Sequence, residues 1–144
     1  MSGKLRVLVV GLGNMGMSHA KAYTRIEGFE VAAVCERRVA QRRLPAELEF
    51  VQRFTAFEDA LEKTKPDVVS INTWSDTHAD YAIKAMEAGA HVFVEKPLAL
   101  TVDDAERVVA AAKRTGRKLV IGYILRHHPS WTKGHHGRCF DLIL

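Results

Sequence analysis

The chain has 144 residues, a length that suits one domain with a hydrophobic core of its own. Hydrophobic residues make up 47% and charged residues 26% of the chain, values that exclude a disordered protein. The formal net charge of +4 allows an anionic ligand without requiring a nucleic acid. Two cysteines, Cys35 and Cys139, are too few for a disulfide framework, and no apolar run approaches the ~20 residues that span a bilayer. We therefore expect a cytoplasmic protein that binds neither nucleic acid nor a membrane.

Short apolar runs alternate with amphipathic stretches along the chain. Strands are predicted at residues 5–10, 29–35, 50–52, 68–72, 91–95 and 118–123. Helices are predicted at 14–27, 37–44 and 56–62, from Asp76 or Thr77 to Gly89, and from Thr101 to Gly116. Strands separated by helices at this spacing imply crossover connections. The predicted fold is therefore an α/β, doubly wound and mostly parallel sheet of the Rossmann type.

Candidate capping residues precede three of these helices. Thr55 is the predicted cap of the helix at 56–62, and Asp76 or Thr77 that of the helix ending at Gly89. Thr101, with Asp104 three residues later, has the spacing of a capping box.

The pattern stops after residue 124, and we divide the chain there. Residues 1–124 form the predicted domain, and 125–144 an irregular tail with four of the seven histidines. The spacing of these histidines and Cys139 matches no standard zinc pattern, so no metal site is expected. Apolar side chains near 98–100 and in the tail favour a homo-oligomer.

A glycine-rich loop follows the first predicted strand directly and opens the first predicted helix. Its sequence is Gly11-Leu12-Gly13-Asn14-Met15-Gly16. In this context Gly11 permits the tight turn, Gly13 lets a pyrophosphate approach the backbone, and Gly16 lets helix and strand pack closely. The N–H groups of Asn14 and Met15, at the positive end of the helix, would face the phosphates. The alternative is a tight turn with no ligand.

An acidic residue, Glu36, ends the second predicted strand 20 residues after Gly16. A carboxylate at this distance accepts hydrogen bonds from the ribose of NAD. Arg37 and Arg38 follow it, and Arg42 and Arg43 come one turn later. These arginines could instead pair with the 2′-phosphate of NADP, or they could form a solvated helix face. The pattern favours NAD and leaves NADP open.

A second group of polar residues follows the later predicted strands. Thr73, Trp74 and His78 come after the fourth strand, and Glu95 with Lys96 after the fifth. The carboxyl ends of parallel strands meet at one edge of the sheet, so these residues should share a crevice with the glycine loop. Ligands bind at this edge in doubly wound folds.

Lys96 is the candidate for chemistry, because a lysine there could exchange a proton with a substrate hydroxyl. Glu95 would orient Lys96 or contact the cofactor. A surface Lys-Pro turn is the alternative. For His78 a packed, hydrogen-bonded position is favoured over catalysis, and Trp74 either shields the cofactor or is a large apolar loop residue. His19 is expected to be an ordinary helix residue.

These motifs resemble the Gfo/Idh/MocA oxidoreductases, above all in Glu95-Lys96-Pro97-Leu98-Ala99-Leu100-Thr101. The resemblance implies an N-terminal Rossmann domain that holds NAD or NADP. It also implies hydride transfer at a CH–OH carbon of a sugar, cyclitol or polyol.

By this resemblance Lys96 corresponds to the active-site lysine. The implied cofactor-binding residues are Gly11, Gly13, Asn14, Met15, Gly16, Glu36, Arg37, Thr73, Trp74, His78, Glu95 and Lys96. Family members also carry a C-terminal α/β domain that this chain lacks, so we expect dinucleotide binding with little or no turnover. The alternative is a non-enzymatic nucleotide-binding module or a truncated remnant.

Overall fold

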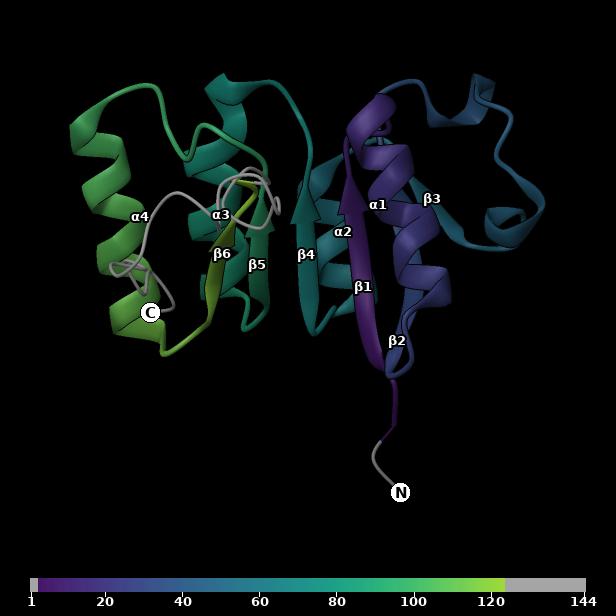
Figure 1. Cartoon of the computed structure of the whole chain (residues 1–144), viewed down its shortest axis with the longest axis horizontal. Helices are drawn as coiled ribbons and strands as arrows, with labels where there is room; N and C mark the ends of the chain where they lie inside the picture. Colours follow the sequence, from purple (N-terminus) through teal and green to yellow (C-terminus); the bar gives the residue numbers. More distant parts are fainter. Residues whose placement is uncertain (1–2, 124–144) are drawn as a thin grey trace, which may run out of the picture.

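The computed structural model describes residues 3–123, which form a sheet covered by helices on both faces (Figure 1). The strands are β1 (Leu5–Val10), β2 (Phe29–Cys35), β3 (Gln52–Phe54), β4 (Val68–Ile71), β5 (His91–Val94) and β6 (Leu119–Ile121). The helices are α1 (Asn14–Arg25), α2 (Phe57–Thr64), α3 (His78–Glu87) and α4 (Val102–Thr115). Short 3-10 turns lie at η1 (Val39–Gln41), η2 (Ala46–Leu48) and η3 (Ser75–Thr77).

The six strands run in the order β3-β2-β1-β4-β5-β6, and every neighbouring pair is parallel. Val10, at the end of β1, pairs with Cys35 on one side and Ile71 on the other. From β1 the strands are added on one side as far as β3, and from β4 onward they are added on the other side. The boundary between β1 and β4 is therefore the topological switch point, where this fold binds ligands. The predicted doubly wound parallel sheet is confirmed.

Side-chain alternation divides the core into two layers. Val7 and Val9 pack on the face covered by α1, whereas Leu8 and Val10 pack on the face covered by α2, α3 and α4 (Figure 1). Successive residues of a strand point to opposite faces, so a run of buried valine and leucine fills both layers at once. The sheet is thereby packed on both faces beneath the edge that carries the polar residues.

The segment between β2 and β3 differs from the sequence prediction. No helix forms at 37–44, where the chain instead makes the η1 turn, with η2 following. Only Val39 and Leu44 of this segment are buried, which is too narrow an apolar stripe to hold a short helix on the core. The third strand lies at Gln52–Phe54 rather than 50–52, because Phe54 packs on the core while Phe50 is exposed.

The predicted cap of α2 is wrong, because Ala56 and not Thr55 occupies its N-cap position. Of the two candidates for α3, Thr77 is the N-cap residue, whereas Asp76 lies within η3. The hydroxyl of Thr77 donates to the carbonyl of Trp74 and makes no cap bond. A threonine before a helix has competing local acceptors, and here the η3 turn supplies one.

Thr101 is confirmed as the N-cap of α4, but the Asp104 carboxylate accepts from its hydroxyl and not, as in a full capping box, from its backbone N–H. The hydroxyl of Thr101 accepts a hydrogen bond from the backbone N–H of Asp104 at 3.1 Å and donates to its carboxylate at 2.8 Å. Gly116 ends the helix in the left-handed conformation, with a φ of 65°. Leu98, expected near an exposed surface, is buried, whereas Leu100 is exposed.

Other element ends differ from the predicted ones by a few residues, as helix and strand ends commonly do. The tail at 125–144, with Cys139 and its histidines, lies outside the described residues. Within residues 3–123, none of the helices has the length and apolar character needed to cross a membrane.

Candidate dinucleotide-binding site

Backbone hydrogen bonds align the ends of consecutive strands along one edge of the sheet. The N–H of Gly11 donates to the carbonyl of Cys35, and the N–H of Asn72 donates to that of Val10. In the same way, the N–H groups of Glu36, Glu95 and Gly122 donate to the carbonyls of Phe54, Ile71 and Val94, respectively. The first residue after each of β1, β2, β4, β5 and β6 is thereby brought into one row. This row carries the glycine loop, Glu36 and Glu95, as the strand order predicts.

The glycine loop packs directly on the end of β4. Gly11 has a φ of +80°, and a Cβ there would lie 2.6 Å from the carbonyl oxygen of Asn72. A Cβ on Gly16 would overlap the carbonyl oxygen of Gly11 and come within 3.2 Å of the Asn72 side chain. Both positions therefore require glycine, one for its backbone conformation and the other for space.

Gly13 has a different environment, because a Cβ there would meet no atom within 4 Å. It is the N-cap of α1 and supplies no side chain to cap the helix. Asn14 and Met15 follow it and are exposed. The first turn of α1 thus presents backbone N–H groups toward open space, which is the arrangement that binds phosphate at a helix N-terminus.

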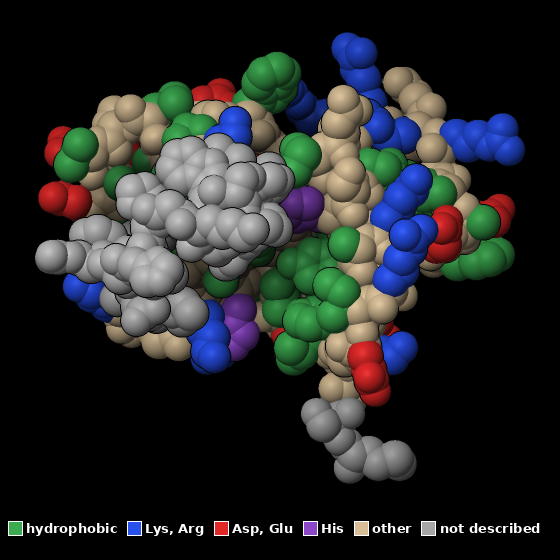
Figure 2. All heavy atoms as spheres, in the orientation of Figure 1, with side chains coloured by type: hydrophobic (Ala, Val, Ile, Leu, Met, Phe, Trp, Pro, Cys, Tyr) green, Lys and Arg blue, Asp and Glu red, His purple; other side chains and the backbone are tan. Residues whose placement is uncertain are grey.

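Glu36 forms a two-point ion pair with Arg42. The Nε atom of Arg42 lies 2.9 Å from Oε2, and its Nη2 lies 3.2 Å from Oε1. Glu36, Arg42 and two further arginines, Arg38 and Arg43, line a shallow hollow, and Figure 2 shows Lys and Arg side chains gathered at this end of the molecule. Arg37 is exposed and does not line it. The arginine that contacts Glu36 is therefore Arg42, which spacing alone did not single out.

His78 joins the two loops that follow β4 and β5. Its ring is 1% exposed, with Nδ1 2.6 Å from the carbonyl oxygen of Pro97 and Nε2 3.1 Å from that of Thr73. This is the packed, hydrogen-bonded position favoured from the sequence. His78 fixes the spacing of the loops that hold Thr73 and Lys96. Lys96 and Trp74 are exposed, and Trp74 is 81% exposed.

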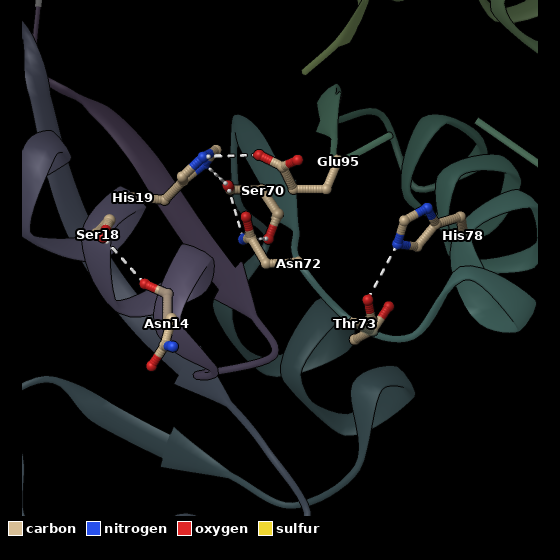
Figure 3. A network of polar contacts seen from close by, with 8 residues as sticks. All are labelled: Asn14, Ser18, His19, Ser70, Asn72, Thr73, His78 and Glu95. Carbon is tan, nitrogen blue, oxygen red and sulfur yellow. Dashed lines mark hydrogen bonds and ion pairs between the residues drawn. The ribbon is translucent and has the colours of Figure 1, made fainter. Parts of the chain in front are cut away.

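A buried polar network lies beneath this edge, between α1, β4 and β5 (Figure 3). His19 of α1 has Nδ1 3.0 Å from the hydroxyl of Ser70 and Nε2 3.2 Å from Oε1 of Glu95. The side-chain amide of Asn72 donates to the hydroxyl and the carbonyl of Ser70, each at 3.1 Å. His19 is thus a site residue, not the ordinary helix residue expected from the sequence. Periodicity could not reveal it, because its partners are more than fifty residues away in the chain.

The residues at this edge fit a dinucleotide. Oδ1 of Asn72 is buried beside the glycine loop without a hydrogen-bond partner among the described residues. The glycine loop and the helix N-terminus suit the pyrophosphate, and the carboxylate of Glu36 after β2 suits the adenosine ribose. Among residues 3–123 no cluster of three or more His, Cys, Asp or Glu side chains could hold a metal ion.

Fold and site together define a Rossmann domain of the dinucleotide-dependent oxidoreductase class. The family described as "Oxidoreductase family, NAD-binding Rossmann fold", Gfo/Idh/MocA, matches residues 5–123. The match covers most of the chain, and the chain belongs to this family.

Individual relatives agree with this assignment. The chain is 34% identical over 127 residues to a glycosyl hydrolase family 109 protein of Shewanella pealeana, covering 81% of this chain and 28% of that one. It is 31% identical over 135 residues to an inositol 2-dehydrogenase of Salmonella paratyphi B, covering 90% and 40%. Scyllo-inositol dehydrogenase from Lactobacillus casei, solved with NAD(H) and scyllo-inositol, superposes with a TM-score of 0.77 at 27% identity, covering 90% of this chain and 39% of that one. The chain thus spans less than half the length of these relatives.

Proposed function

We propose that this chain binds NAD(H) as the cofactor domain of an oxidoreductase that acts on a CH–OH carbon of a sugar, cyclitol or polyol. The observation that carries the proposal is the single row at the carboxyl edge of the sheet, where the glycine loop, Glu36 and the Glu95-Lys96 pair stand at the ends of β1, β2 and β5. Relatives named as inositol and sugar dehydrogenases support the substrate class. When bound, NAD supplies the hydride acceptor.

Each part of the edge has a separate task in this proposal. The N–H groups after Gly13 bind the pyrophosphate, and Glu36 accepts hydrogen bonds from the adenosine ribose. Thr73 and Trp74 lie on the loop after β4, and His78 begins α3 and links this loop to the one after β5, where the nicotinamide half would reach. Lys96 is exposed there and exchanges the proton of the substrate hydroxyl.

The Glu36 carboxylate favours NAD over NADP in this proposal. A 2′-phosphate would meet a negative charge at that position. Arg42 already uses two nitrogens on Glu36, which leaves fewer donors for a phosphate. Arg38 and Arg43 line the same hollow and keep some affinity for NADPH.

Calorimetric titration of the purified chain with NADH and, in parallel, NADPH tests the cofactor assignment. Saturable binding of both, tighter for NADH, is the expected result. Gly13→Ala is the matched variant, because its methyl group meets no protein atom but would stand where the pyrophosphate approaches. Absence of binding by the unsubstituted chain would overturn the proposal.

The chemical part is tested separately by following NADH formation with a panel of cyclitols and sugars. We expect little or no turnover from this chain alone, because hydride transfer needs a positioned substrate. Polyol oxidation by this chain that disappears in Lys96→Ala would contradict that expectation and support the role of Lys96 directly. Activity that survives in Lys96→Ala would remove Lys96 from the mechanism.

A further inference from the structure

His19 takes no part in the function proposed so far, yet its imidazole occupies a central position. The side chain leaves α1 one turn after the glycine loop and is 16% exposed. Its ring meets Phe93 edge-on, with centroids 4.8 Å apart and an interplanar angle of 68°. Both ring nitrogens have polar neighbours, Ser70 on β4 and Glu95 after β5 (Figure 3). One residue therefore connects the helix of the phosphate site with two strands.

The donors and acceptors around His19 are compatible with a neutral ring. The amide of Asn72 donates to the hydroxyl oxygen of Ser70, which leaves the hydroxyl proton available for Nδ1 of His19. Nε2 then carries the ring proton and lies 3.2 Å from Oε1 of Glu95, which is an ion-pair distance. In this arrangement the ring is neutral and Nδ1 is its acceptor, whereas in a protonated ring Nδ1 would donate to the second lone pair of the Ser70 oxygen. Burial lowers the pKa of His19, while the Glu95 carboxylate acts in the opposite direction.

Glu95 is confined on its other side by β6. A Cβ on Gly122 would lie 3.0 Å from Oε1 and 3.1 Å from Cδ of Glu95. The carboxylate, 8% exposed, is thus held between His19 of α1 and the backbone of Gly122. Lys96 follows directly in the chain. Because the two residues are adjacent, the loop conformation that places the Glu95 side chain between these contacts also sets the starting point of the Lys96 side chain.

We propose that His19 is a positioning residue, which holds Glu95 and thereby sets Lys96 and the nicotinamide side of the cleft relative to the glycine-loop helix. This inference rests on the proposed function. The inference assigns the two halves of the cofactor to different groups of residues. The adenosine diphosphate half depends on the glycine loop and Glu36, whereas the nicotinamide half depends on the His19–Glu95 contact.

Calorimetric titration with NADH and with ADP-ribose, which lacks the nicotinamide, tests the inference. The variants are His19→Asn and His19→Gln. The asparagine amide reaches the position of Nδ1 but is too short to contact Glu95, whereas the glutamine amide nitrogen reaches that of Nε2. We expect His19→Asn to weaken NADH binding about tenfold. ADP-ribose affinity should stay within about twofold of the unsubstituted chain. His19→Gln should restore most of the NADH affinity.

Ser70→Ala provides a second, independent variant that keeps His19. It removes the partner of Nδ1, while the Asn72 amide keeps its bond to the Ser70 carbonyl. NADH binding should weaken about threefold, with ADP-ribose again unaffected.

The outcomes separate the inference from the proposed function. Equal weakening of NADH and ADP-ribose, or unchanged NADH affinity in both His19→Asn and Ser70→Ala, would overturn the positioning role alone. Loss of both ligands from the unsubstituted chain would overturn the proposed function and this inference with it. Circular dichroism of each variant shows whether the fold is kept.

Discussion

Arg42 lies against Glu36 with two nitrogens, each within 3.2 Å of a different carboxylate oxygen. Two-point contacts of this kind fix the plane of a carboxylate as well as its position. Here the guanidinium comes from the turn after β2, so a local ion pair orients the group that would receive the ribose. The hollow around the pair is lined by Arg38, Gln41 and Arg43.

Cofactor preference follows from this pair. We expect Glu36→Ala to lower NADH affinity about tenfold and to improve NADPH affinity relative to NADH, because Arg42 is released for a 2′-phosphate. Arg42→Met is the matched control and should weaken NADPH more than NADH. Titration of both nucleotides gives the ratio of dissociation constants. An NADH-to-NADPH ratio unchanged in Glu36→Ala would contradict a ribose-binding role for Glu36.

Two glycines of the loop should respond to alanine in opposite ways. Gly16→Ala places a methyl group onto the carbonyl of Gly11 and should destabilise the fold by about 3 kcal/mol or more. Gly13→Ala meets open space, so the free energy of unfolding should change by less than about 1 kcal/mol while NADH binding is lost. Urea denaturation and NADH titration measure the two effects. A Gly16→Ala chain as stable as the unsubstituted one would show that the loop does not pack on β4.

The pH dependence of stability should carry a contribution from His19. Its pKa is lowered in the folded chain, chiefly by burial, so below the unfolded value of about 6.5 the unfolded chain binds more protons than the folded one. The free energy of unfolding should therefore fall as the pH drops below about 6.5, by at most about 1.4 kcal/mol per pH unit, and this contribution should be flat above it.

His19→Gln isolates this contribution, because glutamine does not titrate. The difference in free energy of unfolding between the two chains, measured by urea denaturation, should no longer change with pH above pH 7. A difference profile of constant value between pH 5 and 7 would show that the folded and unfolded chains hold the His19 proton equally.

Cys35 should be unreactive while the chain is folded. Burial, assisted by the charges of Glu58, Asp59 and Glu36, raises the pKa of its thiol to about 12. Since the thiolate is the nucleophile, iodoacetamide at pH 8 should modify Cys35 much more slowly in buffer than in urea. Mass spectrometry of the peptide that contains Cys35 gives both rates. Equal rates would place Cys35 at an accessible surface.

Much of the fold could be predicted because its local signals agree. Each of three local patterns is compatible with only one kind of structure. These are the valine and leucine run of β1, the glycine loop after it, and Gly116 after α4. The segment after Glu36 could not be predicted in this way. Its arginines are compatible with a helix, and the fold uses them in turns because few apolar side chains there reach the core.

The residues of the site likewise divide into those that could be predicted from the sequence and those that could not. The place of Glu95 and Lys96 at the carboxyl edge could be predicted because parallel strands bring their ends to one edge. His19, Ser70 and Asn72 could not, since their contacts join α1, β4 and β5 through side chains. Arg42 was visible only as one of several arginines, and its contact with Glu36 depends on the η1 turn.

The two layers of the core are unequal, and this has a consequence for local opening. The layer beneath α2, α3 and α4 holds most of the buried apolar residues, whereas α1 covers the smaller layer and contributes only Ala20 to its buried apolar side chains. Segments with few buried contacts open at lower free energy than the global transition. The amide hydrogens of α1 should therefore exchange before those of α3. A ligand that contacts both the glycine loop and the end of β5 would link the smaller layer to the larger one. Binding of such a ligand should therefore slow the hydrogen exchange of the α1 amides.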